Sequence, residues 1–163
     1  MTTAPQSPGS KSSKLMWGIA AGFTLPIIIF LTAVGVPGFQ SFRARQWSAE
    51  AKLNVRQLCR LTLRLHERER VWREAGPLPD PMPKGGERVL FGAYKAFTEI
   101  GFTPHKVRYQ YEVKLQREGE KIVLIRCMAR GDQDGDGVLA TFAVGVIPES
   151  KELTAIDITD ELE

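Results

Sequence analysis

Cysteine is nearly absent from this sequence, and its scarcity excludes a disulfide scaffold. Cys59 and Cys127 are the only two cysteines in 163 residues, and neither lies in a CxxC spacing that would indicate a metal or redox site. The two residues fit either a bonded pair in an oxidising compartment or two small buried hydrophobes. We expect the second arrangement, in which folding needs no disulfide.

Histidine is equally scarce. His66 and His105 are the only two, and neither has a serine or cysteine nucleophile pattern or a second metal ligand nearby. The sequence also lacks a glycine-rich loop between a strand and a helix, so nucleotide binding has no support. We therefore expect no enzyme activity, and no cofactor apart from the cation considered below.

Charge is absent from Leu15 to Phe42, a run of 28 residues. About 20 such residues can cross a bilayer as a helix. Because a helical pattern continues beyond this run to about Trp72, the sequence predicts one long helix with a kink at Pro37. Its transmembrane half is predicted at residues 15–38 and its amphipathic half at 39–74, after a flexible tail at 1–14.

The amphipathic half combines an apolar face with a basic row. The apolar face recurs at spacings of four and three residues and is expected to cover a sheet; it contains Ala51, Val55, Leu58, Thr62 and Leu65. The basic row recurs at strict intervals of four and contains Lys52, Arg56, Arg60, Arg64 and Arg68. Its four arginines form either a solvated flank or a surface for acidic partners, lipid headgroups or DNA. Nucleic acid is not expected, because no aromatic residues interrupt the row.

The remainder of the chain predicts a small antiparallel sheet. Residues 75–86 (AGPLPDPMPKGG) end the helix and begin a Pro-rich loop. Residues 107–115 then alternate apolar and polar side chains, as a strand does, and a turn leads into a second strand at 121–129. Further strands are predicted at 138–146 and 153–158. The predicted fold is therefore α+β, with the long N-terminal helix packed on a sheet in a head formed by residues 75–163.

One predicted loop has the residues of a candidate calcium-binding site. Asp132, Asp134 and Asp136, with Gly135 and Gly137, match the opening of a calcium-binding loop, in which close carboxylates and a tight turn wrap a hard cation. The position for the distal glutamate is Ala143, so extra ligands would have to come from backbone carbonyls, Glu149 or Glu152. A solvated Asp/Gly turn between two strands explains the same residues.

Several short segments occur in an order that resembles a known family. They are Val36–Arg45 (VPGFQSFRAR), Glu50–Val55 (EAKLNV) and Glu99–Pro104 (EIGFTP), the last followed by Tyr109 and Tyr111. These segments are similar to those of type IV pilins and pseudopilins. Gly22-Phe23-Thr24-Leu25 looks like the prepilin cleavage site of that family, but Pro26 and Ile27 follow where a glutamate is expected. Alignment on Pro37 instead places the cleavage position at Leu15.

The resemblance implies a pilin-like structural subunit, a minor pilin or pseudopilin of a type IV pilus or a type II secretion-like filament system. The alternative is a non-polymerising binding module anchored in the inner membrane. Either reading implies a single-pass inner-membrane protein with a periplasmic head, and the first adds a pilus or extracellular filament. The implied partners are other pilin or pseudopilin subunits and inner-membrane lipid. Cleavage of the leader stays open.

Overall fold

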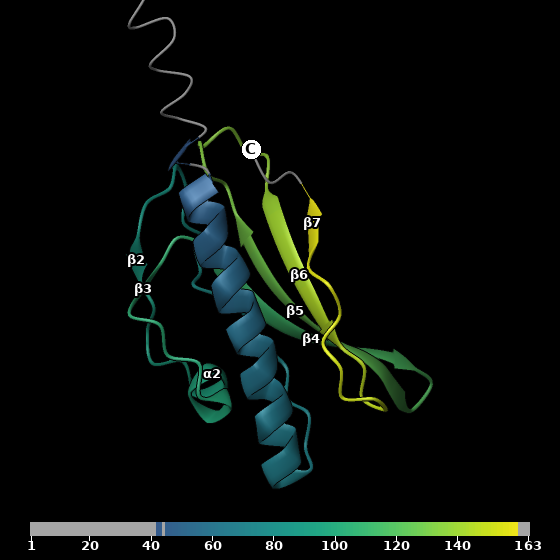
Figure 1. Ribbon diagram of the computed structural model, residues 1–163. Helices are drawn as coiled ribbons and strands as arrows, with labels where there is room; N and C mark the ends of the chain where they lie inside the picture. The colour runs from purple at the N-terminus through teal and green to yellow at the C-terminus, as the bar shows by residue number, and fades with distance from the viewer. Residues whose placement is uncertain (1–41, 44, 160–163) are drawn as a thin grey trace, which may run out of the picture. The chain divides into compact units, whose positions relative to one another are not determined.

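The computed structural model describes residues 42–43 and 45–159. A long helix at residues 45–69 is followed by a Pro-rich segment and then mainly by strands (Figure 1). The other elements are β1 (Ala75–Leu78), β2 (Val89–Leu90), α2 (Lys95–Ile100), β3 (Lys106–Val107), β4 (Gln110–Glu118), β5 (Lys121–Gly131), β6 (Ala140–Val146) and β7 (Asp157–Thr159). The fold is α+β, with a five-stranded antiparallel sheet in the order β1-β4-β5-β6-β7.

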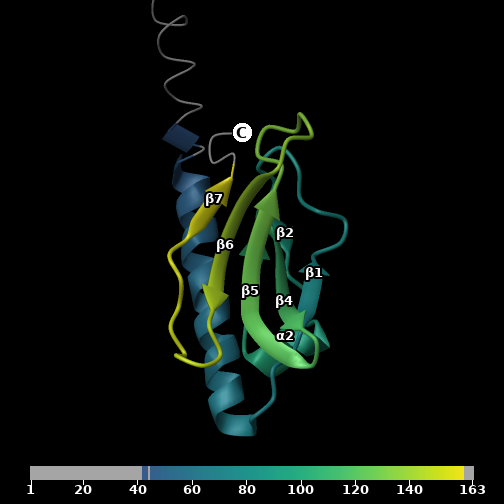
Figure 2. The same cartoon turned by 90° about the vertical axis from the view of Figure 1, so that its right-hand side faces the viewer.

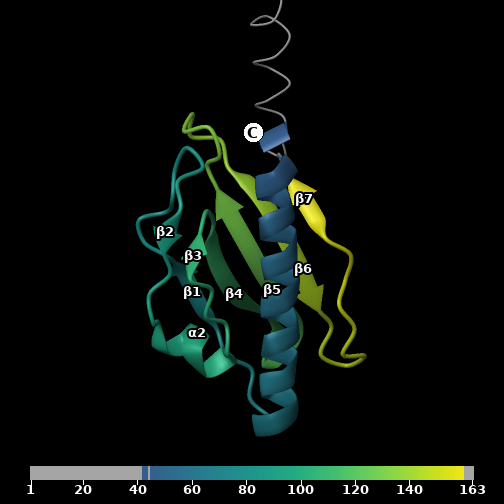
Figure 3. The same cartoon turned by 60° about the vertical axis from the view of Figure 1, so that its left-hand side comes forward.

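The long helix lies along one face of this sheet (Figure 3), and its apolar side is the side that the sequence predicts. Ala51, Val55, Leu58 and Thr62 are fully buried, and Leu65 is 3% exposed. Thr62 satisfies its hydroxyl within the helix by donating to the Leu58 carbonyl oxygen at 2.9 Å. The spacing of four and three residues therefore places one continuous stripe against the sheet.

The predicted 15–74 helix with a transmembrane half is wrong as the first element of the fold. In the described part of the chain the long helix runs over residues 45–69, and it ends before residue 74 because Arg70 adopts a left-handed backbone with φ of 61°. The Arg70 N–H donates to the His66 carbonyl oxygen at 2.8 Å, which closes the last turn. None of the helices in the described part of the chain is long and apolar enough to cross a membrane. The predicted tail at 1–14 and membrane half at 15–38 lie outside the described residues.

The central strands follow the predicted alternation. On β4 and β5 the side chains that face the helix pair across the strands, Tyr111 with Ala129 and Val113 with Cys127. All four are buried. Figure 2 shows the opposite face of the sheet turned toward the viewer, with the long helix behind it. The alternation therefore gives the sheet one face for the core and one that no helix of the described residues covers.

The edges of the sheet differ from the prediction. β1 forms inside the segment predicted as a loop, and it pairs with β4 although it contains Pro77, because an edge strand can accommodate a residue without an N–H. β6 begins at Ala140 rather than 138, since the Val138 N–H donates to the Asp136 carboxylate at 2.7 Å. The predicted strand at 153–158 is reduced to a bridge at Leu153 and the short β7.

A second group of elements extends the core beside the helix. α2 and the two-stranded β2–β3 sheet were not predicted from the sequence, and Figure 3 shows them next to the long helix on one side. Phe91 contacts Phe97, Phe102 and Tyr111, with ring centroids 5.2–6.2 Å apart. These edge-on aromatic contacts join the α2 region to β4 and bury a large apolar area.

A disulfide joins Cys59 of the long helix to Cys127 of β5, with 5.7 Å between the Cα atoms. This finding overturns the expectation of two unpaired buried cysteines. Both side chains are buried at the contact between the helix and the middle strand of the sheet. They meet because the helix turns its Cys59 side toward β5. Neither the helical spacing around Cys59 nor the strand alternation around Cys127 determines this rotation.

Replacing Leu58 with alanine should lower the free energy of unfolding by about 2–5 kcal/mol, because it leaves a cavity between the helix and the sheet. Leu53→Ala is the matched control on the same helix, since that leucine is 68% exposed. Urea unfolding of the full-length chain in a nonionic detergent measures both. Equal effects of the two substitutions would contradict the packing described here.

Removing the disulfide should also destabilise the fold. The bond closes a loop with a sequence separation of 68, and chain entropy assigns such a loop about 4 kcal/mol. The double variant Cys59→Ala with Cys127→Ala should melt at a lower temperature than the oxidised chain. It should be insensitive to reductant, whereas the unsubstituted chain should lose stability when reduced. Unchanged melting of the unsubstituted chain in reductant would show that the bond contributes nothing.

Candidate functional site

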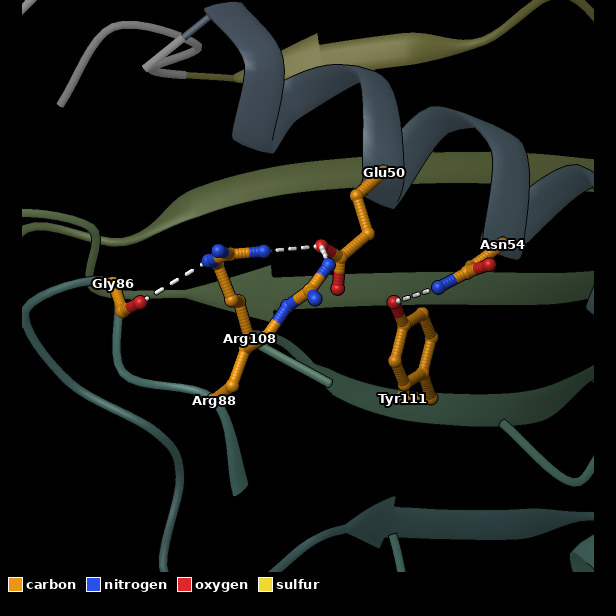
Figure 4. Close-up of polar contacts among 6 residues, drawn as sticks. All are labelled: Glu50, Asn54, Gly86, Arg88, Arg108 and Tyr111. Carbon is orange, nitrogen blue, oxygen red and sulfur yellow. Dashed lines mark hydrogen bonds and ion pairs between the residues drawn. The ribbon is translucent and has the colours of Figure 1, made fainter. Parts of the chain in front are cut away.

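A polar cluster joins the first turns of the long helix to the β2–β3 region (Figure 4). One oxygen of Glu50, Oε2, accepts from Arg108 at 2.5 Å and from Arg88 at 2.9 Å. Arg108 also donates through Nε to the Gly86 carbonyl oxygen at 3.1 Å. One turn further along the helix, Asn54 donates to the Tyr111 hydroxyl at 2.8 Å. These contacts attach the helix to segments far away in the sequence.

Trp47 lies on the same end of the helix and adds a close aromatic contact. The Arg43 and Arg108 guanidinium carbons lie 4.7 and 5.4 Å from its ring centroid. Gly86 has a φ of 68°, and a Cβ at this position would come within 2.3 Å of the Trp47 ring. Only glycine therefore allows the backbone to approach the indole so closely.

The contacts of the cluster attach the helix to the β2–β3 region and to β4. Its nearby phenol stays protonated, because burial raises the pKa of Tyr111 above its usual range. The second carboxylate oxygen of Glu50, Oε1, is buried without a hydrogen-bond partner. Two guanidiniums thus share one carboxylate oxygen, and the partly buried ion pairs orient the helix against the β2–β3 region.

The structure brings the three predicted metal ligands together. Asp132, Asp134 and Asp136 each offer a carboxylate oxygen, and these oxygens lie within 4.8 Å of one another. Asp132 is buried, and its two oxygens accept from the N–H groups of Gly135 at 2.7 Å and Gly137 at 3.2 Å. The Asp134 and Asp136 carboxylates are exposed and accept from backbone N–H groups two residues on. The same contacts build a tight Asp/Gly turn.

The loop that contains Asp132, Asp134 and Asp136, which we call the Asp loop, also contacts the segment that enters the polar cluster. The Gly85 N–H donates to the Asp132 carbonyl oxygen at 2.9 Å, and the backbones of Lys84 and Asp132 form an isolated β-bridge. Gly86 and Arg88, two and four residues after Lys84, belong to the polar cluster. The segment 84–88 is therefore held on one side by the Asp loop and on the other by the long helix.

The three carboxylates supply fewer oxygens than the six to eight that calcium takes. Ala143, at the position of the usual glutamate, pairs with Met128 and Asp157 inside the sheet. Glu149 pairs with Lys121, at the end of β5 farthest from the Asp loop. A cation here would need water or backbone oxygens to complete its shell, which lowers affinity.

The basic row splits into two parts. Arg56, Arg60 and Arg64 are exposed, and within the described residues they make no hydrogen bond or ion pair. Arg68 pairs with Glu69 at 2.7 Å. Lys52 leans toward the sheet, with its Nζ 5.9 Å from the Phe142 ring centroid. Only the middle three arginines therefore present unbalanced positive charge to the surroundings.

The uncovered face of the sheet is electrically balanced by comparison. Glu112 is buried there between Arg130 and Lys114, and Arg126 pairs with Asp157 at 3.2 Å. A hollow of about 250 Å³ on this face is lined by Leu124, Arg126, Ala143, Gly145, Thr154 and Asp157. The charged side chains named on this face are therefore paired, whereas the three arginines of the helix have no partner among the described residues.

His66 is half-buried and stacks on Trp72 with ring centroids 3.9 Å apart. Burial lowers its pKa, and Arg70 and Lys151 lower it further through charge repulsion. The sequence offers a weak signal for this stack, in that an aromatic residue follows the histidine just past the end of the helix.

Comparison with family models, curated proteins and solved structures finds no match to the chain.

We expect calcium to bind the Asp loop weakly, with a dissociation constant of about 10⁻⁴–10⁻³ M. Thermal melts of the full-length chain in detergent, with millimolar calcium or with chelator, measure the shift. Calcium at about 10 mM, roughly a ten- to hundredfold excess over this dissociation constant, would add about 1.4–2.7 kcal/mol. Asp134→Asn with Asp136→Asn should abolish the shift while leaving the Asp132 contacts in place.

The matched control for this experiment removes two exposed carboxylates elsewhere, Asp80→Asn with Glu118→Gln. That variant should keep the full calcium shift. Identical melts of the unsubstituted chain in calcium and in chelator would remove the metal from this loop. A shift that survived the Asp134 and Asp136 substitutions would place the ion elsewhere.

Proposed function

We propose that the chain is a pilin-like structural subunit, a minor pilin or pseudopilin of a type IV pilus or a type II secretion-like filament system. The observation that carries this proposal is the order and packing of the described elements. A helix with one buried face is followed by a Pro-rich segment and an antiparallel sheet, and the helix lies along that sheet. This arrangement agrees with the head that the resemblance implies.

The proposed location is the periplasmic side of the inner membrane, or a filament outside it. The Cys59–Cys127 bond supports it, because such bonds persist in oxidising compartments and are rare in the cytosol. Attachment to the membrane would use the uncharged residues 15–42, nearly all of which lie outside the described part of the chain. The partners in this proposal are other pilin-like subunits and inner-membrane lipid.

A second candidate is a binding module that stays anchored and does not polymerise. The observation in its favour is in the leader, where Pro26 and Ile27 follow Gly22-Phe23-Thr24-Leu25 in place of the glutamate that filament assembly in the family uses. An uncut chain could still present the same head to a periplasmic partner. The two candidates thus differ in the state of the N-terminus.

Intact-mass measurement of protein from bacterial membranes separates the two candidates. A subunit should begin at Leu15, Met16 or Phe23, whereas an anchored module should have its full length. Alkylation before and after reduction should show both cysteines protected until reductant is added. A full-length chain with free thiols in the cytosolic fraction would contradict both candidates.

A further inference from the structure

The side of the long helix that points away from the sheet forms a distinct surface, which we call the free face and define as Leu53, Arg56, Arg60 and Arg64. Arg60 and Arg64 follow Leu53 by seven and eleven residues, about two and three helical turns, so these three side chains lie on one line. All four residues are exposed, and Figure 3 shows this side of the helix uncovered by other described elements.

The charge of the free face is not balanced within the described part of the protein. Neighbouring basic residues have carboxylate partners, as Arg68 has in Glu69 and Arg73 has in Glu99. Arg56, Arg60 and Arg64 have no such partner among the described residues. Three like charges at successive turns repel one another. An external anionic partner would relieve this repulsion.

The exposure of Leu53 indicates which class of partner would bind the free face. It is 68% exposed, the highest value among the large hydrophobic side chains of the described residues. A nucleic-acid backbone gives an exposed leucine no role, and the face has no aromatic residue on which bases could stack. Lipid surfaces take up a whole apolar helix face, and one leucine is too small for this. A protein partner uses both features, because arginine forks pair with carboxylates beside apolar contacts.

We propose that the free face is the docking surface for an acidic amphipathic helix of a partner protein. Carboxylates repeated every four residues on that helix would advance by about 6 Å per step, the same advance as the three arginines. One apolar side chain of the partner would cover Leu53. This docking does not depend on filament assembly or on leader cleavage.

The probe is a fluorescent, alanine-based peptide of about 20 residues, long enough to be helical, with glutamates every four residues and one leucine stripe beside them. Its binding to the full-length chain in nonionic detergent is measured by fluorescence anisotropy at low salt. Two comparison peptides carry glutamine in place of glutamate, or the same composition scattered around the helix. We expect binding of the first peptide to be at least about tenfold tighter than binding of either comparison peptide.

Variants locate the binding on the chain. Arg60→Glu with Arg64→Glu should weaken it by about tenfold or more, and Leu53→Ser by about threefold or more. The matched charge control, Lys106→Glu with Arg117→Glu, changes two exposed basic residues outside the free face by the same net charge and should leave affinity within about twofold. Because all these side chains are exposed, melting temperatures should stay unchanged.

Three outcomes would overturn the proposal. One is equal loss of binding in the control variant, which would mean that only net charge matters. Another is equal binding of the scattered peptide, which would show that the matched spacing of the charges has no role in binding. The third is binding of duplex DNA or of anionic phospholipid vesicles that exceeds binding of the peptide and is unaffected by Leu53→Ser, which would assign the face to a different class of partner.

Discussion

The described fold depends on one contact, the burial of a single stripe of the long helix against the middle of an antiparallel sheet. Leu58 and Val55 fill the space above β4–β6, and Cys59 is bonded to the central strand. Three other described features adjoin this contact. The polar cluster fixes the first turns of the helix, the Phe91 group extends the same core sideways, and the opposite side of the helix is left outside.

The segment 84–88 connects features that lie far apart in the sequence. Asp132, after β5, holds it through Gly85, and Glu50, in the helix, holds it through Arg88. Gly86 sits between these anchors, close against Trp47, where a larger residue would not fit. The Asp loop therefore has a structural role that does not require a metal, and any ion bound there would act on a turn that is already ordered by hydrogen bonds.

Periodicity predicted what depends on neighbouring residues. The buried helix face and the alternation of Tyr109 and Tyr111 follow from local spacing, and both agree with the burial of these side chains. The predicted end of the first helix at residue 74 was wrong, because the left-handed backbone of Arg70 ends the helix earlier and no local signal in the sequence indicates this turn. The cysteine pair and the Glu50–Arg108 contact, 58 residues apart, depend on how the helix is rotated over the sheet. The spacing of Glu50 and Asn54 by one turn was the only local sign of the polar cluster.

The covalent bond between the helix and β5 also determines how the protein would carry mechanical load. If tension were applied along the chain, the path through Cys59 and Cys127 would bypass the residues between them, since the bond closes that whole segment into a loop. Of the described chain, only the helix residues before Cys59 and the strands after Cys127 could then extend. The Pro-rich segment, the α2 region, β4 and the part of β5 that precedes Cys127 would stay shielded from the force. Reduction would expose all of them to it at once.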